Sequence, residues 1–581
     1  MKQTKYKARD FGFDKAIDFP KGSFDLSQTR QGSYDMGVLY PVYVNEMLPG
    51  DTVEMSNIVN MAFNPTVSAV RHEVNATIDW YFVPYGAMPN ITAAEQAALA
   101  GMTNAQKLTY YDPRYGFRNQ FWQTLITGGF DGLNTDTMAS YTPVAADLNP
   151  GSLWDHFGLP MTIAGADYSS NKVIAALFTA YNMIWNWNYR DENWQSAKNP
   201  TGATVTVAGD PSMTIVAMDN TTLLNADWEK DYFTTALKDQ QRGAAQAVTV
   251  QGVGQAVWAA AQFTNTVSSP SAVSVEGANA TTPKLRAIGG TNETTNLQNM
   301  FNTNTLSVSG LGVDIAKLRL SIATQRVLER NARAGARETE FYRAHYGDGP
   351  TDNRGDQPDF IGRYRQPITF ADVVNTSVAG TPAAGTDPTI ATQTMGFRQS
   401  QGDGQGMGGV GTFHCKEFGI LMAVMCIRPR ALYYQKTEKY WFGGRGKFDF
   451  PLPEFANLSE QAVLCRELAP ATAATTTQVF GYQGRYDEYR QKVNDAVGLL
   501  RPTGATGSNA NLRSWNFGRS FAGVPVQGDT FLKVDPAVIK PVNFAYTNAS
   551  VPMLIGTVGN IVQVRGRPLP QIAQPGLMDH I

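Results

Sequence analysis

The sequence predicts a mainly β protein, a β-sandwich whose strands are separated by long excursions. Strand-like segments open and close the chain, and turn-forming residues are frequent, with 54 Gly and 31 Pro among 581 residues. Helical periodicity is confined to a few isolated stretches. Because strands and helices do not alternate regularly, the pattern does not fit a parallel sheet built from βαβ units.

The strand predictions rest on alternation and on apolar runs. Met36–Val44 is apolar and rich in residues that favour strands. Apolar and polar residues alternate over Val74–Phe82, which predicts a half-buried strand that Pro84 ends. Thr412–Ile427 is apolar on both faces and predicts a buried strand. Met553–Val564 is predicted to form the last strand.

Two stretches have the period of a helix. Residues 177–193 carry apolar side chains at helical spacing and end in a polar Arg-Asp-Glu-Asn cluster, which predicts an amphipathic helix. A second helix is predicted over Asp314–Tyr346, with a break at Gly335. The residues that we expect in the core of the subunit include Tyr181, Trp185 and Phe455.

Composition limits the classes of function. Charged residues make up 17% of the chain and the net charge is −2, which excludes electrostatic binding of nucleic acid by the chain as a whole. So few charges fit either a surface covered by other subunits or a large, Asn/Thr/Gln-rich β protein. The basic N-terminus has no apolar segment behind it, and the longest apolar run, 419–427, is too short to cross a bilayer. We therefore expect neither secretion nor membrane insertion.

The sequence contains no catalytic or cofactor-binding motif in the structural context that such a motif requires. Gly404-x-Gly406-x-x-Gly409 has the letters of a dinucleotide fingerprint, but we expect a loop there, because neither the preceding strand nor the following helix is predicted. The three cysteines fit neither a zinc site nor a disulfide framework, and they indicate a reducing compartment. We predict no catalytic residue, metal ligand or cofactor.

Basic and aromatic residues interleave between Tyr433 and Phe448. Such a surface can stack the bases and bind the phosphates of single-stranded nucleic acid. It can equally form a subunit interface, where Tyr, Trp and Arg are enriched, and we favour the interface. The same alternatives apply to the arginines of residues 319–343. The candidate DNA-contacting or interface residues are Lys2, Lys5, Lys7, Arg9, Arg330, Arg333, Arg337, Lys436, Arg445 and Lys447.

Eight blocks in a fixed order carry a resemblance to a known family. They are Phe24–Ser27 with Leu48–Thr52, His72–Pro84, residues 177–195, Asp231–Leu237, residues 318–347, Phe448–Leu458, Phe480–Arg490 and Pro568–Leu577. Together they resemble the major capsid proteins of microviruses, in particular the gokushovirus-like branch. One departure is Lys238-Asp239-Gln240-Gln241, which stands where the family has Pro-Trp-Pro-Gln.

The resemblance implies an eight-stranded viral jelly-roll β-sandwich with long loop insertions that contain short helices. It also implies a T=1 icosahedral shell of about sixty copies around a single-stranded DNA genome. The expected partners are further copies of the chain, the packaged DNA, a small DNA-binding or scaffolding viral protein and a host cell-surface receptor. The expected location is the virion capsid, assembled in the cytoplasm of a bacterial host.

The predicted organisation follows from the same blocks. We expect an N-terminal arm at residues 1–35, a discontinuous jelly-roll core at 36–238 and 311–570, an inserted protrusion at 239–310, and a C-terminal tail at 571–581. The insertion is almost free of charges and suits an exposed, host-binding surface. The alternatives are a phage spike or adhesin that binds carbohydrate and, less favoured, a carbohydrate-active enzyme with paired carboxylates.

Overall fold

A computed structural model describes most of the predicted core and part of the insertion. The described residues are 21–88, 91–92, 140–141, 143–161, 173–174, 176–198, 204–207, 210–216, 221–241, 273–276, 284–287, 315–334, 344, 357–374, 398–456, 460–470, 477–501, 510–521, 523–546, 548, 551–567 and 569. They belong to two units, the first within residues 1–240 and 332–581 and the second within 241–331.

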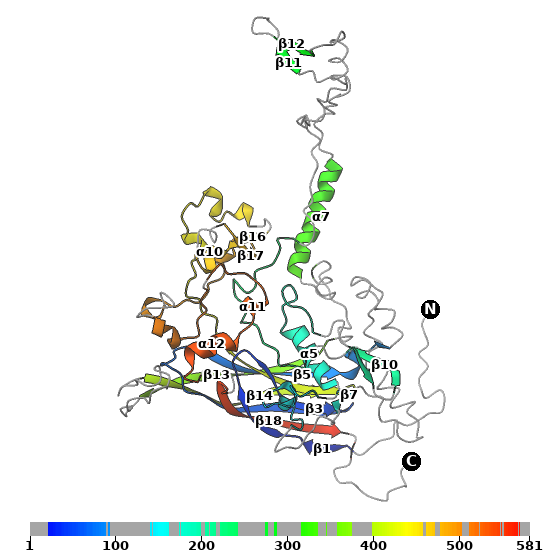
Figure 1. Cartoon of the computed structure of the whole chain (residues 1–581). Coiled ribbons are helices and arrows are strands. Elements are labelled where there is room, and N and C mark those ends of the chain that lie inside the picture. The colour runs from blue at the N-terminus through cyan, green and yellow to red at the C-terminus, as the bar shows by residue number, and fades with distance from the viewer. Residues whose placement is uncertain are drawn as a thin grey trace, which may run out of the picture. The chain divides into compact units, whose positions relative to one another are not determined.

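Nine antiparallel strands form the main sheet of the first unit (Figure 1). They are β1 (Gly22–Asp25), β2 (Gln28–Tyr34), β3 (Leu39–Met47), β4 (Thr52–Phe63), β5 (Val74–Pro84), β13 (Asp359–Val374), β14 (Arg398–His414), β15 (Gly419–Pro429) and β18 (Leu554–Arg567). The order is β1-β18-β4-β14-β13-β5-β15-β3, and β2 also pairs with β18. In Figure 1 the blue β1 lies beside the red β18.

The sheet has eight positions, because β1 and β2 share one edge. β1 pairs with residues 563–567 of β18, and β2 pairs with residues 554–560 of the same strand. Strand β13 connects the two halves of the sheet: its residues 359–368 pair with β5, and residues 369–374 pair with β14. The prediction of a mainly β sandwich of the jelly-roll kind is thus confirmed. Part of the predicted N-terminal arm, residues 22–34, is paired in this sheet.

The main core lies between the two halves of the sheet. In β4 every second side chain from Val53 to Phe63 is buried, as expected for a strand with one face on the core. In β5 all residues are buried, so the prediction of a half-buried strand was wrong. The physical reason is a second apolar cluster on the outer face of β5 and β15, formed with helix α5 (Ala176–Asn188).

Helix α5 is more deeply buried than an amphipathic helix on a protein surface. Its buried residues include Thr179 and Asn182 as well as Phe178, Tyr181 and Trp185. A helix buried on nearly all sides is typical of a layer between other elements, not of one exposed to solvent. The predicted apolar stripe therefore underestimates how much of α5 is covered.

Strand β14 corrects two predictions. The predicted strand Thr412–Ile427 is two strands, because β14 ends at His414 and β15 begins at Gly419. The glycine motif lies within β14 and not in a loop. A β-carbon on Gly406 or Gly408 would lie 2.6 Å from atoms of Tyr364 on β13. These glycines let the tyrosine ring lie across the strand, a role typical of glycine in sheet interiors.

Shorter elements complete the first unit. The strands are β6 (Ile91–Thr92), β7 (Ser140–Tyr141), β8 (Val173–Ile174), β9 (Thr204–Val207), β10 (Asp210–Val216), β16 (Gln461–Leu464) and β17 (Val479–Gln483). The helices are α4 (Leu153–His156), α10 (Cys465–Leu468), α11 (Asp529–Leu532) and α12 (Pro536–Asn543). The 3₁₀ turns used below are η7 (Lys439–Trp441), η8 (Lys447–Asp449), η9 (Pro453–Phe455) and η11 (Asp487–Tyr489).

The second unit contains a hairpin and most of a long helix. Strands β11 (Val273–Glu276) and β12 (Lys284–Ala287) pair antiparallel. Helix α7 (Ile315–Ala334) begins where the sequence predicts it and ends before Gly335. Most of the predicted protrusion, residues 239–310, lies outside the described residues.

Candidate nucleic-acid and subunit interface

The structure places the predicted contact residues in different environments. Lys2, Lys5, Lys7, Arg9 and Arg337 lie outside the described residues. Arg330 is exposed on α7, and Arg333 belongs to the same helix. Lys436, Arg445 and Lys447 belong to the basic-aromatic segment of the first unit. Tyr433 and Tyr434, at the start of that segment, are buried, so only its later part reaches the surface.

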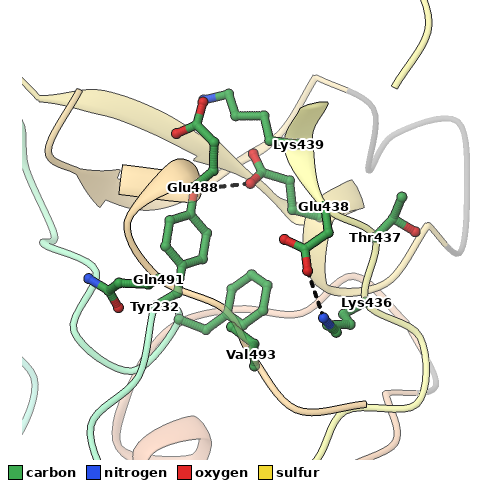
Figure 2. A pocket seen from close by; sticks show the side chains of 10 residues that line it. Tyr232, Lys436, Thr437, Glu438, Lys439, Glu488, Gln491 and Val493 are labelled. Atoms are coloured by element: carbon green, nitrogen blue, oxygen red, sulfur yellow. Dashed lines mark hydrogen bonds and ion pairs between the residues drawn. The ribbon is translucent and has the colours of Figure 1, made fainter. Parts of the chain in front are cut away.

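Lys436 lies inside the subunit. Its side chain is only 5% exposed, and its Nζ lies 2.8 Å from Glu438 Oε1 and 3.8 Å from Asp495 Oδ2. Figure 2 shows Lys436 and Glu438 joined at the wall of a small pocket that Lys439 and Glu488 also line. The charge of Lys436 is therefore compensated within the subunit.

The same pocket contains a buried carboxyl group, Glu467, which is 1% exposed. The backbone N–H of Leu464 donates to Glu467 Oε1 over 2.9 Å, and the hydroxyl of Tyr232 donates to Oε2 over 3.1 Å. Burial raises the pKa of Glu467 to about 7, and the neighbouring Glu488 adds to the increase. The carboxyl group thus takes up a proton near neutral pH.

We predict that this proton makes the stability of the subunit depend on pH. Between pH 4.5, the ordinary pKa, and about 7, the folded chain keeps a proton on Glu467 that the unfolded chain has lost. Stability should therefore fall as pH rises through this window, by up to about 1.4 kcal/mol per pH unit, and change no further above it. A Glu467→Gln variant should match the wild type at pH 4 and be more stable at pH 8, measured by thermal unfolding. Glu454→Gln, at an exposed position, is the control and should follow the pH profile of the wild type. Parallel pH profiles for Glu467→Gln and the wild type would contradict the prediction.

Exposed aromatic side chains gather around Arg445. Trp441 is 74% exposed, Phe450 52% and Tyr489 46%. The guanidinium of Arg445 lies 4.2 Å from the ring centroid of Phe450 and donates to the Tyr489 hydroxyl over 2.8 Å. The ring of Tyr440 contacts both Trp441 and Tyr489, at centroid distances of 4.9 and 5.5 Å. We call these five residues the aromatic–arginine cluster.

This cluster has the composition of an interface hot spot. Trp, Tyr and Arg are the residues that most often dominate the binding energy between proteins. Lys447 is exposed in the adjacent turn η8, so a positive charge lies beside the rings. The cluster can therefore either pack against another subunit or stack on bases.

The three residues expected in the core differ in burial. Tyr181 is 1% exposed; its hydroxyl donates to the Leu39 carbonyl over 2.8 Å and accepts from the Leu224 N–H over 3.0 Å. Trp185 is 5% exposed, and its indole N–H donates to the Asn225 carbonyl. Phe455, in η9, is only partly buried.

Within the part of the chain that the structure describes, no three His, Cys, Asp or Glu side chains lie close enough to hold a metal ion. The cysteines Cys415, Cys426 and Cys465 are all buried and free. Burial raises the pKa of Cys415 to about 12 and that of Cys426 to about 11, which makes both thiols poor nucleophiles. Among the helices within the described ranges, none has the length and apolar character needed to cross a membrane.

Known proteins align with this chain over nearly its whole length. Residues 110–577 match the family described as Capsid protein (F protein). Capsid protein VP1 of Chlamydia phage 1 is 24% identical, and the alignment covers 90% of this chain and 91% of the relative. Capsid protein VP1 of Spiroplasma virus 4 is also 24% identical, with 99% of each chain covered. The same protein of Bdellovibrio phage phiMH2K is 24% identical, with 95% of each covered.

The match confirms the resemblance to microvirus capsid proteins. It also favours a structural role over the two alternatives, a carbohydrate-binding spike and a carbohydrate-active enzyme, because the family consists of capsid proteins. A family match over most of the chain, a jelly-roll type of sheet and relatives aligned along their full length all agree. The chain belongs to the family of phage capsid proteins described as Capsid protein (F protein).

Proposed function

We propose that this capsid protein assembles into a closed T=1 shell of about sixty copies, which encloses single-stranded DNA and carries a host-binding protrusion on each subunit. The observation that carries the proposal is the aromatic–arginine cluster. Three large aromatic side chains stand exposed around one arginine, which is costly in an isolated subunit and favourable once a neighbouring copy removes them from water.

The second unit supports self-association independently. Helix α7 exposes Leu318, Leu320, Ile322 and Val327, with exposed fractions of 37 to 68%. Leu318 and Ile322 are four residues apart and so share one side of the helix, whereas Leu320 and Val327 share another. We infer that this helix contacts other copies in the shell.

The low net charge bears on how the genome is held. A chain of net charge −2 cannot neutralise packaged phosphates by its overall field. We infer that local groups do so, among them Lys2, Lys5, Lys7 and Arg9 of the N-terminal arm together with Arg445 and Lys447. A small basic viral protein would supply the rest of the positive charge. Three free, buried thiols suit assembly in the reducing cytoplasm of a bacterial host.

Deletion of residues 245–305 tests this assignment. We expect the shortened chain to form closed shells in electron micrographs, because the deleted residues belong to the second unit, whereas the main sheet belongs to the first. Viruses that carry the deletion should lose infectivity, because the host-binding surface is gone. The wild-type chain, imaged alongside, should form shells of similar diameter.

Two outcomes would contradict the proposal. Elongated trimers or dispersed particles from the wild-type chain would favour a spike or a non-assembling protein. A deletion that prevents the subunit from folding, measured as loss of soluble protein, would show that residues 245–305 belong to the core.

A further inference from the structure

A hollow of about 290 Å³ lies beside the aromatic–arginine cluster, in the first unit. The segment from Lys439 to Asp449 and the strand pair β16–β17 contribute to its lining. Its charged groups are Lys439, Arg445, Arg466 and Arg485, against Asp449 and Glu488. The size is near the lower end, about 300 Å³, of sites for small ligands. Arg466 and Arg485 were not singled out from the sequence.

Arg466 has a buried hydrogen-bond donor in this hollow that lacks an acceptor among the described residues. Its guanidinium lies 4.3 Å from the ring centroid of Phe442, which holds it on one side. Its Nε is buried and makes no hydrogen bond to any residue that the structure describes. A buried N–H without an acceptor is unfavourable, and phosphate or carboxylate oxygens are the partners that fit the planar fork of a guanidinium.

The neighbouring charges do not compensate Arg466. The Asp449 carboxylate accepts from the Gly446 N–H over 2.6 Å, and the Glu488 carboxylate accepts from the Gln461 side chain. Lys439 donates to the Ala462 carbonyl over 2.8 Å. The two acids are thus engaged within the subunit, and the hollow keeps a positive surplus.

Arg485 extends the positive surface. Its guanidinium lies 5.1 Å from the ring centroid of Tyr486, the one non-glycine residue within the described ranges with a left-handed backbone, at φ 64°. Backbone strain of this kind is concentrated at functional sites. Arg485 also lines a second hollow, of about 420 Å³, whose other charged groups are Arg490, Glu460 and Asp487.

We propose that the hollow at Arg466 binds one nucleotide of single-stranded DNA, with a phosphate on Arg466 and Arg485 and a base against Tyr440 and Phe442, which line the hollow. This inference rests on the proposed enclosure of a DNA genome and names its site. A polynucleotide fits better than the acidic side chain of a neighbouring copy, because it satisfies cations and aromatic rings together.

The test is a titration of the full chain with fluorescein-labelled oligothymidylate at several salt concentrations. Arg466→Gln should weaken binding about tenfold and lower the slope of log K against log salt by about 0.7, the value for one lost phosphate contact on a single strand. Phe442→Leu should weaken binding with little change in slope, because it keeps the charges. Arg565→Gln is the matched control: this arginine is 63% exposed, pairs with Glu54 on the sheet and should leave binding unchanged.

The outcomes separate this site from the proposed function. Unchanged affinity and slope in a folded Arg466→Gln variant overturn the site, while shells that still contain DNA leave the proposed function intact. If Arg466→Gln abolishes shells without affecting oligonucleotide binding, the hollow is a contact between copies and the proposal is overturned. Wild-type chain that forms no shells would contradict the proposed function itself.

Discussion

Replacing Asp79 with alanine is expected to destabilise the subunit by about 3 kcal/mol, near the lower end of the range for breaking a buried ion pair. Asp79 on β5 is fully buried, and it accepts from Arg363 Nε and Nη2 on β13 over 2.6 and 2.7 Å. The hydroxyl of Tyr189, just after α5, donates to the same carboxylate over 2.7 Å. One side chain therefore links two strands to the end of the covering helix.

The expected loss of stability comes mainly from the buried partner of Asp79. Without the carboxylate, the Tyr189 hydroxyl loses its buried acceptor, while Arg363, which is about half exposed, can still reach water. This exposure keeps the loss at the lower end of the range. Thermal unfolding measures the effect, with Glu54→Ala as control, because the Glu54–Arg565 pair is more than half exposed and should contribute at most about 1 kcal/mol. Equal shifts for the two variants would show that the Asp79 link does not stabilise the fold.

Replacing Trp185 with alanine should cost about 3–5 kcal/mol and remove most soluble subunit. The indole is 5% exposed in the cluster between α5 and the sheet, and its N–H donates to the Asn225 carbonyl over 3.0 Å. Truncation leaves a cavity and an unpaired carbonyl. Soluble yield and the temperature of the first unfolding transition measure the loss.

Trp441→Ala provides the matched control for this prediction. It removes the same side chain from a position that is 74% exposed, so the stability of the isolated subunit should hardly change. A comparable loss of soluble protein from Trp441→Ala would mean that the exposed cluster supports the fold itself.

Local patterns in the sequence predict the class of fold but not what covers each strand. Alternation over Val74–Phe82 identifies a strand, yet its second buried face depends on α5, which lies far along the chain. Strand β14 has too many glycines to be recognised from β propensity. Its glycines leave room for Tyr364 of β13, whose ring fills the space that side chains on β14 would occupy. Burial of this kind is a tertiary effect that no local window contains.

The same limit applies to the candidate site. Lys436 and Arg445 lie in one basic-aromatic segment, but Asp495, from a distant part of the chain, helps to compensate the first, while aromatic rings surround the second. Arg466 has no aromatic neighbour in its own segment, and only folding brings Phe442 to it. The family was recognised from the sequence because eight blocks in a fixed order are specific even when each is short.

The position of β18 has a consequence for biosynthesis. This strand lies between β4 and the N-terminal strands β1 and β2. One edge of β4, residues 52–63, can therefore form its hydrogen bonds only after residues 554–567 have been synthesised. Contacts so distant in sequence make folding slow and place it after translation. A chain that stops before residue 554 leaves β4 with an open edge, which invites aggregation.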